Sequence, residues 1–242
     1  MENKNKVLGI SLDGVIRDVF AKYDDVYRKA FIKNDSLVQA DESFSYVVSE
    51  LNADDNELNK LEKMIEEKIT LPINTYDLQN HYQFDSKENF QNFFQEYAFE
   101  LYATAGTFPR TPDTLNRLQG FGKANGIFDT VLLVKGNDKI VTSTYHFLAK
   151  IGCKINKVVF VDNDIDKWNY CDVLIDDSPE SFESKPENKI SIKISHEYNA
   201  YSDSDYSFEN LNAIYNELFI LKVFMPEKYL EIINSKKSNN NE

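Results

Sequence analysis

Short, nearly uninterrupted apolar runs recur along the second half of the chain. They stand at 130–134 (TVLLV), 157–161 (KVVFV) and 172–176 (DVLID), and a more alternating run follows at 190–194 (ISIKI). Another apolar run stands near the start, at 7–12. Runs of this length without polar alternation are typical of strands buried on both faces of a parallel sheet. The pattern predicts an α/β fold with a Rossmann-like parallel sheet of about five strands.

Helical spacing of apolar residues dominates the region between the first run and the others. It extends over about 18–32, 54–69 and 86–103, where the second helix has an acidic start and the third an aromatic stripe. A later helix is expected from Thr111, because Pro112 gives up a backbone donor that the first turn leaves free anyway. One more is predicted over about 140–151, between two of the strands.

The order of these elements predicts how the chain is divided. Residues 1–17 and 106–220 form the expected core, and residues 18–105 form a helical cap inserted after the first strand. Residues 221–242 are predicted to be a C-terminal helix followed by a polar tail. Pro226 is expected to break or restart the last helical segment.

Composition narrows the range of partners. The 242 residues include 40 acidic and 27 basic ones, for a formal charge of -13, which argues against general nucleic-acid or membrane binding through overall charge. No apolar run approaches the roughly 20 residues of a membrane-spanning helix. The polar start predicts no signal peptide, and two cysteines are too few for a disulfide framework. We expect a cytoplasmic protein, located in the host cytoplasm or the virion if a phage encodes it.

Few glycines and many Asn, Lys, Asp and Tyr residues are typical of AT-rich genomes, including those of many phages. The three histidines, His81, His146 and His196, show no metal-ligand spacing and are interpreted as ordinary surface or core residues.

Acidic residues follow several of the predicted strands. Asp13 follows the first, Lys167 comes after an acidic stretch behind the run 157–161, and Asp176 and Asp177 end the run 172–176. Ligands of parallel α/β sheets bind at the carboxyl ends of the strands. Carboxylates are the ligands that Mg²⁺ prefers, and a lysine binds an anion. The pattern indicates a magnesium and phosphate site, although the last acidic pair taken alone is also typical of a simple turn.

With this order of elements, several segments resemble the haloacid dehalogenase (HAD) superfamily, most closely its 5'(3')-deoxyribonucleotidase-type phosphatases of bacteria and phages. ISLDGVIRD resembles the first motif, D-x-D-G-x-x-x-D, and FPRTPDTLNRL the segment that re-enters the core after the cap. VVFVDNDIDKW is similar to the lysine-bearing third motif, DVLIDDSPESF to the acidic fourth, and ISHEYNAY to a Tyr-Asn segment. The resemblance covers about residues 6–220. It implies a HAD-like core and phosphoryl transfer through an aspartyl-phosphate, assisted by magnesium.

The chain departs from the family pattern at two positions. Ser11 stands where the resemblance places the nucleophilic aspartate, and a serine hydroxyl is unionised near neutral pH and needs an adjacent base to attack. Lys135 and Gly136 stand where the family has a small hydroxyl residue that binds the phosphoryl group.

The resemblance also assigns roles to the residues that are retained. Asp13 is expected to be a vestigial acid/base, and Lys167 and Lys135 are the predicted phosphate-binding residues. The expected ligands of a weakened magnesium site are Asp13, Asp176 and Asp177.

Three functions follow as hypotheses. The favoured one is a catalytically impaired pseudoenzyme that acts as a structural or binding protein, in a phage as part of the virion or its assembly. Its partner would be another protein or a second copy of the chain. The first alternative is an active Mg-dependent 5'-nucleotidase or phosphatase. The second is a sensor that binds a nucleotide or phosphate without hydrolysing it.

Overall fold

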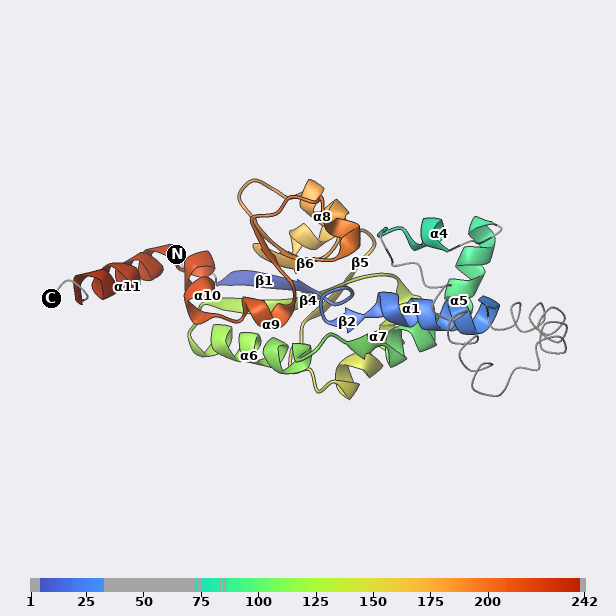
Figure 1. Ribbon diagram of the computed structural model, residues 1–242. Helices are drawn as coiled ribbons and strands as arrows, with labels where there is room; N and C mark the ends of the chain where they lie inside the picture. Colours follow the sequence, from blue (N-terminus) through green and yellow to red (C-terminus); the bar gives the residue numbers. More distant parts are fainter. Residues whose placement is uncertain (1–4, 33–72, 74, 83, 85, 240–242) are drawn as a thin grey trace, which may run out of the picture.

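The centre of the fold is a parallel sheet. The structure, a computed structural model, describes residues 5–32, 73, 75–82, 84 and 86–239. Within them six strands pair in the order β5-β4-β1-β6-β7-β8, every pair parallel (Figure 1). The strands are β1 Lys6–Ser11, β4 Phe128–Lys135, β5 Val158–Val161, β6 Val173–Asp176, β7 Ile190–Ile194 and β8 Tyr206–Phe208. The predicted α/β class and its five strands are confirmed, and β8 is a sixth strand at the edge.

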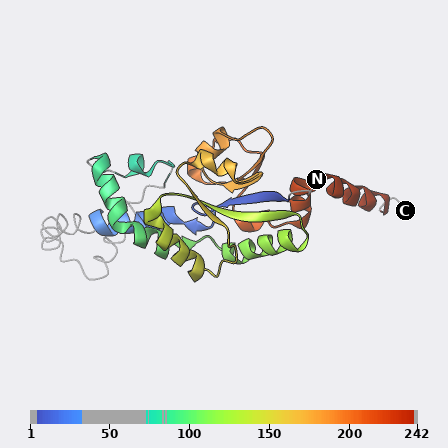
Figure 2. The same ribbon diagram turned by 180° about the vertical axis from the view of Figure 1, so that it is seen from behind.

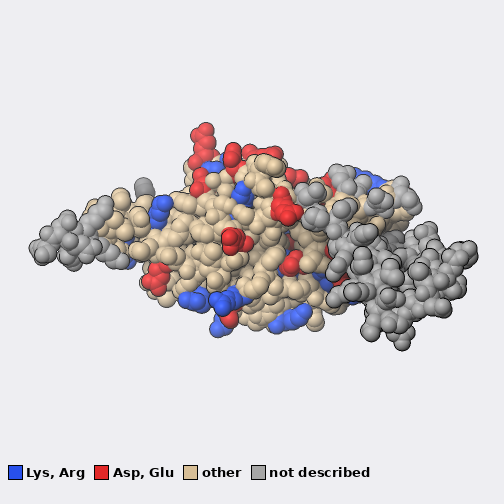
Figure 3. All heavy atoms as spheres, in the orientation of Figure 1, with Lys and Arg blue, Asp and Glu red and all other residues tan. Residues whose placement is uncertain are grey.

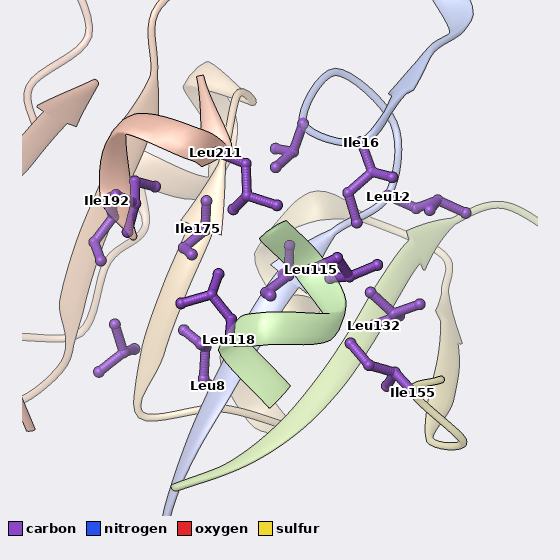
Figure 4. Packing of buried hydrophobic residues seen from close by; sticks show 14 of the residues in the cluster. Leu8, Leu12, Ile16, Leu115, Leu118, Leu132, Ile155, Ile175, Ile192 and Leu211 are labelled. Carbon is purple, nitrogen blue, oxygen red and sulfur yellow. The ribbon is translucent and has the colours of Figure 1, made fainter. Parts of the chain in front are cut away.

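Helices cover both faces of this sheet. One face is packed against helices α6 Thr111–Ala124, α7 Asp138–Lys150, α9 Leu211–Ile214 and α10 Glu217–Phe224 (Figures 1 and 4). The other face is covered by the 3-10 helix η2 Asp164–Asn169 and by α8 Pro179–Glu183. The Trp168 indole donates a hydrogen bond to the Ser181 carbonyl at 2.8 Å, which ties η2 to α8.

Alternation along the strands sends side chains to both faces. In β4, Leu132 belongs to the larger apolar cluster with Leu115 and Leu118 of α6, whereas Leu133 packs with Trp168 on the opposite face. Figure 4 shows the α6 side chains between those of β1, β4 and β6. Full burial of a side chain of this size contributes about 1.5–3 kcal/mol, so this cluster is a main source of the fold's stability.

Further helices lie between β1 and β4. They are α1 Val19–Tyr27, which continues as the π-helix η1 Arg28–Ile32, then α4 Leu78–His81 and α5 Lys87–Thr104. Their contact is aromatic, with Tyr23, Tyr82 and Phe93 in one buried cluster. The two-residue strands β2 Arg17–Asp18 and β3 Gly106–Thr107 pair antiparallel where the chain leaves and re-enters the core. The helix predicted over 54–69 lies outside the described residues, and the division into core and cap stays a prediction.

The C-terminal part restarts at Pro226 as expected. The 3-10 helix η3 Glu197–Asn199 follows β7, and α10 is followed directly by α11 Pro226–Asn239. Leu221 and Phe224 of α10 belong to the core cluster. Figures 1 and 2 show α11 projecting from the body at the end opposite α1 and α5.

Acidic side chains are spread over the face seen in Figure 3, and basic ones gather along its lower edge, near α6 and α7. Of the helices that the structure describes, none is both long and apolar enough to cross a membrane.

Candidate functional site

The predicted site residues come from neighbouring strand ends. Ser11 is the last residue of β1, Lys135 the last of β4, and Asp176 the last of β6. Because β1 pairs with β4 on one side and with β6 on the other, these ends lie at one edge of the sheet. Lys167 lies in η2, directly after β5. The structure therefore places the predicted residues in one region.

Ser11 is enclosed at the tip of β1. It is 1% exposed, and its hydroxyl has no hydrogen-bond partner in the described part of the chain. In register it lies beside Leu133 of β4. A neutral hydroxyl in such surroundings has no neighbouring base to activate it.

Asp13 is held by an arginine that the sequence interpretation missed. Arg17 is fully buried, and its Nε and Nη2 donate to the two Asp13 oxygens at 2.5 and 3.1 Å. Such a bidentate pair is among the stronger hydrogen-bonded arrangements in proteins. The loop makes this pairing possible because it turns back on itself. The Gly14 amide donates to the Arg17 carbonyl, and the Arg17 amide donates to the Leu12 carbonyl.

Arg17 also links the core to the helices of the predicted cap. Its Nη1 donates to the Tyr102 carbonyl of α5 at 3.0 Å and to the Thr144 hydroxyl of α7 at 3.3 Å. The guanidinium lies 4.6 Å from the centre of the Tyr102 ring and 5.2 Å from that of Phe147. The guanidinium is thus fixed from several sides, which holds Asp13 in its ion pair.

The carboxylate of Asp176, the last residue of β6, is held by a lysine. Lys167 Nζ donates to its two oxygens at 3.0 and 2.9 Å, and the Ser181 hydroxyl donates to Oδ2. Lys167 also lies 2.6 Å from Asp164 Oδ1. Burial lowers the pKa of Lys167, but the charges of Asp176 and Asp164 outweigh it and hold that pKa above its usual value. Lys167 is therefore already engaged by two buried carboxylates.

Asp164 was not assigned a role from the sequence, yet it is central to this region. It is fully buried at the start of η2, and Lys135 Nζ lies 2.6 Å from its Oδ2. Burial raises the pKa of Asp164, but the positive charges of Lys167 and Lys135 outweigh it and lower that pKa overall. The two lysines predicted to bind phosphate are thus joined through one carboxylate.

Asp177 differs from the other carboxyl groups of this site because it forms no direct ion pair with any residue in the described part of the chain. Burial, followed by the charge of Asp176, raises the pKa of Asp177 well above its usual range, and the charge of Lys167 only partly offsets this. The Tyr198 hydroxyl donates to Asp177 Oδ2 at 2.5 Å. Its carboxyl packs against Gly14, where an added Cβ would lie 1.8 Å from Oδ2.

The segment after β7 supports these groups. Asn199 Nδ2 donates to the carbonyls of Asp177 and Ile194, both at 2.8 Å. The His196 Nε2 atom lies 2.7 Å from the Gly14 carbonyl, and the His196 ring stacks on Tyr198. His196 therefore has a local structural role that its isolated position in the sequence did not indicate.

A cavity of about 680 Å³ opens beside this region. Asp13, Lys135 and Asp177 line it from the core, and Phe20 and Phe90 are among the aromatic residues that line it from α1 and α5. It therefore offers both apolar surface and charged groups. Cavities of this size accept small-molecule ligands.

Tyr76, another residue that the sequence interpretation missed, also lines this cavity. Its hydroxyl donates to Asp164 Oδ2 at 3.2 Å, and Lys135 Nζ lies 5.6 Å from the centre of its ring. Burial and the charges of Asp177, Asp164 and Asp176 raise its pKa well above the usual value. The phenol therefore stays protonated and acts as a donor.

The predicted magnesium ligands are all engaged within the chain. Asp13 pairs with Arg17, Asp176 pairs with Lys167, and Asp177 accepts a hydrogen bond from Tyr198. Among the described residues, no group of three His, Cys, Asp or Glu side chains is arranged to hold a metal ion. Magnesium requires carboxylate oxygens that are ionised and free to coordinate. In this arrangement Asp13 and Asp176 are paired within the chain, and their role as magnesium ligands stays a prediction.

Comparisons with known proteins identify the fold. No protein-family model and no curated protein matches the sequence. The HAD hydrolase YfnB from Bacillus subtilis, solved with bound magnesium, aligns with a TM-score of 0.51 at 13% identity over 88% of this chain and 98% of YfnB. A haloacid dehalogenase-like hydrolase from Streptococcus pneumoniae aligns with a TM-score of 0.50 at 12% identity, over 87% of this chain and 96% of its own.

Likeness at this level of identity shows a shared fold and does not carry over an activity. The predicted resemblance to the superfamily is confirmed at the level of the fold, and the narrower resemblance to nucleotidases stays a prediction. The chain therefore has the fold of the haloacid dehalogenase-type hydrolases.

Proposed function

We propose that this chain binds an anionic small molecule in the cavity beside the strand ends and does not form an aspartyl-phosphate. The observation that carries the proposal is the end of β1. A buried, neutral Ser11 stands where the predicted resemblance places the nucleophile, and the neighbouring Asp13 is held by the Arg17 guanidinium. A carboxylate in a bidentate ion pair is a poor proton donor or acceptor, because a proton transfer would break that pair.

The lining of the cavity supports an anionic ligand that also has a planar part. Lys135 and Lys139 bring positive charge to it. Of its acidic residues, Asp13 is paired with Arg17 and Asp177 accepts a hydrogen bond from Tyr198, while Asp77 and Glu180 also line it. Lys135 has a side chain that is 39% exposed, so one side of it is open to a ligand. The aromatic walls suit a ring, and a nucleotide or aryl phosphate has both features.

The second candidate is a Mg-dependent phosphomonoesterase. The comparisons with HAD-fold hydrolases, which extend over nearly the whole length of those proteins, support it better than they support a non-catalytic role. The side chain of Asp13 is 25% exposed and lines the cavity, as a catalytic acid would. This candidate needs a nucleophile other than an aspartate at position 11, such as a water molecule activated by Asp13.

One assay separates the two candidates. Release of inorganic phosphate from a deoxyribonucleoside monophosphate and from an aryl phosphate is measured with magnesium for the natural chain, Ser11→Asp and Asp13→Asn. We expect no turnover by the natural chain. Turnover at enzyme-like rates that Asp13→Asn abolishes would overturn the proposal and establish the esterase.

Binding is tested separately by calorimetric titration of the same deoxyribonucleoside monophosphate. We expect Lys139→Ala to weaken binding several-fold, because Lys139 lines the cavity. Lys150→Ala is the matched control, since Lys150 is exposed at the other end of the same helix, α7. Equal effects of the two substitutions would contradict binding in this cavity.

A protein partner or a role in a phage particle stays a prediction. Co-purification of the tagged full chain with a large particle would favour it over the small-ligand proposal.

A further inference from the structure

One edge of the sheet is apolar along its whole strand. β5 is the last strand on the β4 side, and within the described residues it pairs with β4 alone. Its sequence is VVFV, and Val158, Val159 and Phe160 are each only half-buried. Edge strands are commonly shielded by charged residues or proline, because their free backbone groups accept a further strand. β5 contains neither.

Exposed apolar side chains flank this edge on both faces of the sheet. Tyr145 of α7 is 51% exposed, and its ring lies 6.0 Å from that of Phe160. On the other face, Ile165 of η2, the element that directly follows β5, is 52% exposed. Large apolar side chains gathered at the surface are typical of a face that another chain covers.

The backbone groups available for pairing follow from the hydrogen bonds to β4. The Lys157 and Val161 carbonyls accept hydrogen bonds from β4 and from the residue after it. Peptide groups alternate in direction along a strand, so the N–H and C=O groups of Val158 and Phe160 point away from β4. In the described part of the chain no other strand lies on that side.

The opposite edge of the sheet differs from this one. Asp205 comes directly before β8, lies 3.2 Å from Lys185 and accepts a hydrogen bond from the Ser191 amide at 2.7 Å. Charged side chains beside an edge strand discourage the addition of another strand. Of the two edges, β5 is therefore the one suited to association.

The charges on either side of β5 indicate which partner fits it. Lys154 and Lys157 precede the strand and Asp162 follows it, and all three are exposed. When two copies of β5 lie antiparallel, the basic start of each strand is beside the acidic end of the other. A parallel pair would bring like charges together, which is unfavourable. The strand is thus complementary in charge to a second copy of itself.

We propose that two copies of this chain associate through β5, antiparallel about a two-fold axis, to form one sheet that continues through both copies. In the register that uses the free groups of both residues, Val158 of one copy is opposite Phe160 of the other, and the two Val159 residues face each other on the axis. This surface is separate from the cavity, and the inference does not depend on the proposed function.

The first test measures the oligomeric state. Sedimentation equilibrium of the full natural chain is followed over about a hundredfold range of concentration, because a dimer obeys mass action. We expect the average mass to rise from that of one chain to that of two. The mass of a single chain at every concentration would overturn the proposal.

A proline substitution locates the surface. Val158→Pro removes an N–H that points away from β4, and we expect it to raise the dissociation constant of the dimer at least about tenfold. Ser207→Pro is the matched control at the other edge. There the Phe208 carbonyl accepts a hydrogen bond from the Ser195 amide, so the Ser207 N–H points away from β7. An unchanged dissociation constant in folded Val158→Pro, with folding checked by circular dichroism, would exclude β5 as the interface.

A cysteine substitution tests the register and decides the matter if Val158→Pro does not fold. Facing residues of a non-hydrogen-bonded antiparallel pair have Cα atoms about 4.5 Å apart, which a disulfide can bridge. Under mild oxidation we expect Val159→Cys to form a disulfide between chains at least about tenfold faster than Ser207→Cys, read on a non-reducing gel. The natural chain, with Cys153 and Cys171, gives the background. Equal rates in the two variants would contradict the proposed pairing.

A charge exchange tests the direction of the two strands. Lys157→Glu should weaken the dimer about threefold, and adding Asp162→Lys to it should restore the affinity of the natural chain. A parallel pair already has like charges side by side, so the single substitution would leave its affinity unchanged. That result would rule out the antiparallel arrangement.

Discussion

The ends of β1 and β6 lie side by side in the sheet, but the cations that pair with their carboxylates come from different parts of the chain. At β6, the carboxylate of Asp176 is held by Lys167, which comes from the separate element η2. At β1, the last residue is a neutral serine, and the cation for Asp13 is Arg17, four residues further along the chain at the start of β2. At both strand ends, a cation of the chain itself pairs with the carboxylate, without any ligand. Acids and bases gathered at strand ends are therefore explained by folding alone and are not in themselves evidence of catalysis.

The largest effect is expected from breaking the pair at β6. Lys167→Met leaves Asp176 and Asp164 buried, with Asp176 deprived of its cation. We expect a loss of about 3–5 kcal/mol in the free energy of unfolding, measured by urea denaturation at pH 7. Lys135→Met is the control, because Lys135 is partly exposed and Asp164 still has Lys167, so the expected loss is about 1 kcal/mol. Equal losses of stability in the two variants would contradict the inference that Lys167 is the main cation for these buried carboxylates.

Breaking the pair at β1 should cost somewhat less. Arg17→Met removes the cation of Asp13, but the Asp13 side chain is 25% exposed and gains hydration. We expect a loss of about 2–4 kcal/mol. A double-mutant cycle with Asp13→Asn measures the coupling of the two side chains, and a coupling free energy near zero would show that Arg17 acts only through Tyr102 and Thr144.

The Ser181 hydroxyl, which bonds to Asp176 at the end of β6, allows a finer test of how this carboxylate is held. Ser181→Ala removes a hydrogen bond to the Asp176 carboxylate and leaves its ion pair with Lys167 in place. The expected loss, again from urea denaturation, is about 1.5 kcal/mol, typical of a hydrogen bond to a charged group. Ser184→Ala, whose hydroxyl bonds to the Glu180 carbonyl near the surface, should change stability by less than about 0.5 kcal/mol. The reverse order would contradict this account of Asp176.

The smallest expected effect is in the pH dependence of the free energy of unfolding, and it comes from His196. Burial lowers the pKa of His196 below its usual value of 6.5. The unfolded chain therefore takes up a proton first as the pH falls, so the contribution of His196 is fully present above about pH 6.5 and is lost at lower pH. We expect a loss of under about 1 kcal/mol between pH 7.5 and 5.5, from urea denaturation at both values.

His196→Gln should remove that part of the pH dependence and His146→Gln should not, because His146 is exposed on α7. The raised pKa of Asp177 acts in the opposite direction, reducing stability as the pH rises, but it is common to both variants and cancels between them. An identical pH response in the two variants would contradict the role given to the His196 ring.

Most of the fold was predictable because buried parallel strands leave an unambiguous pattern. The runs at 130–134 and 172–176 became β4 and β6 within two residues at either end. β8 was not predicted, since Tyr206–Phe208 has only three residues and lies at the edge, where alternation over so short a stretch is indistinguishable from a loop.

The location of the site was predictable from the sequence, but the partners that its side chains bond to were not. The acidic residues were found because they directly follow apolar runs. Arg17 was missed, although the four-residue spacing from Asp13 is a signal, because the pairing depends on a loop that turns back on itself. Tyr76 was missed because it belongs to no motif, and only the packing of distant segments brings it to Asp164.

The close approach of Gly14 to Asp177 has a consequence for mutational scanning of this chain. The glycine has a φ of 71°, and any larger residue would also collide with the carboxyl group behind it. Every replacement at this position should therefore fail in a screen for correctly folded protein, whether or not any reaction takes place. Intolerance at an Asp-Gly dipeptide of this kind reports on architecture, and selection for solubility alone would be enough to keep it.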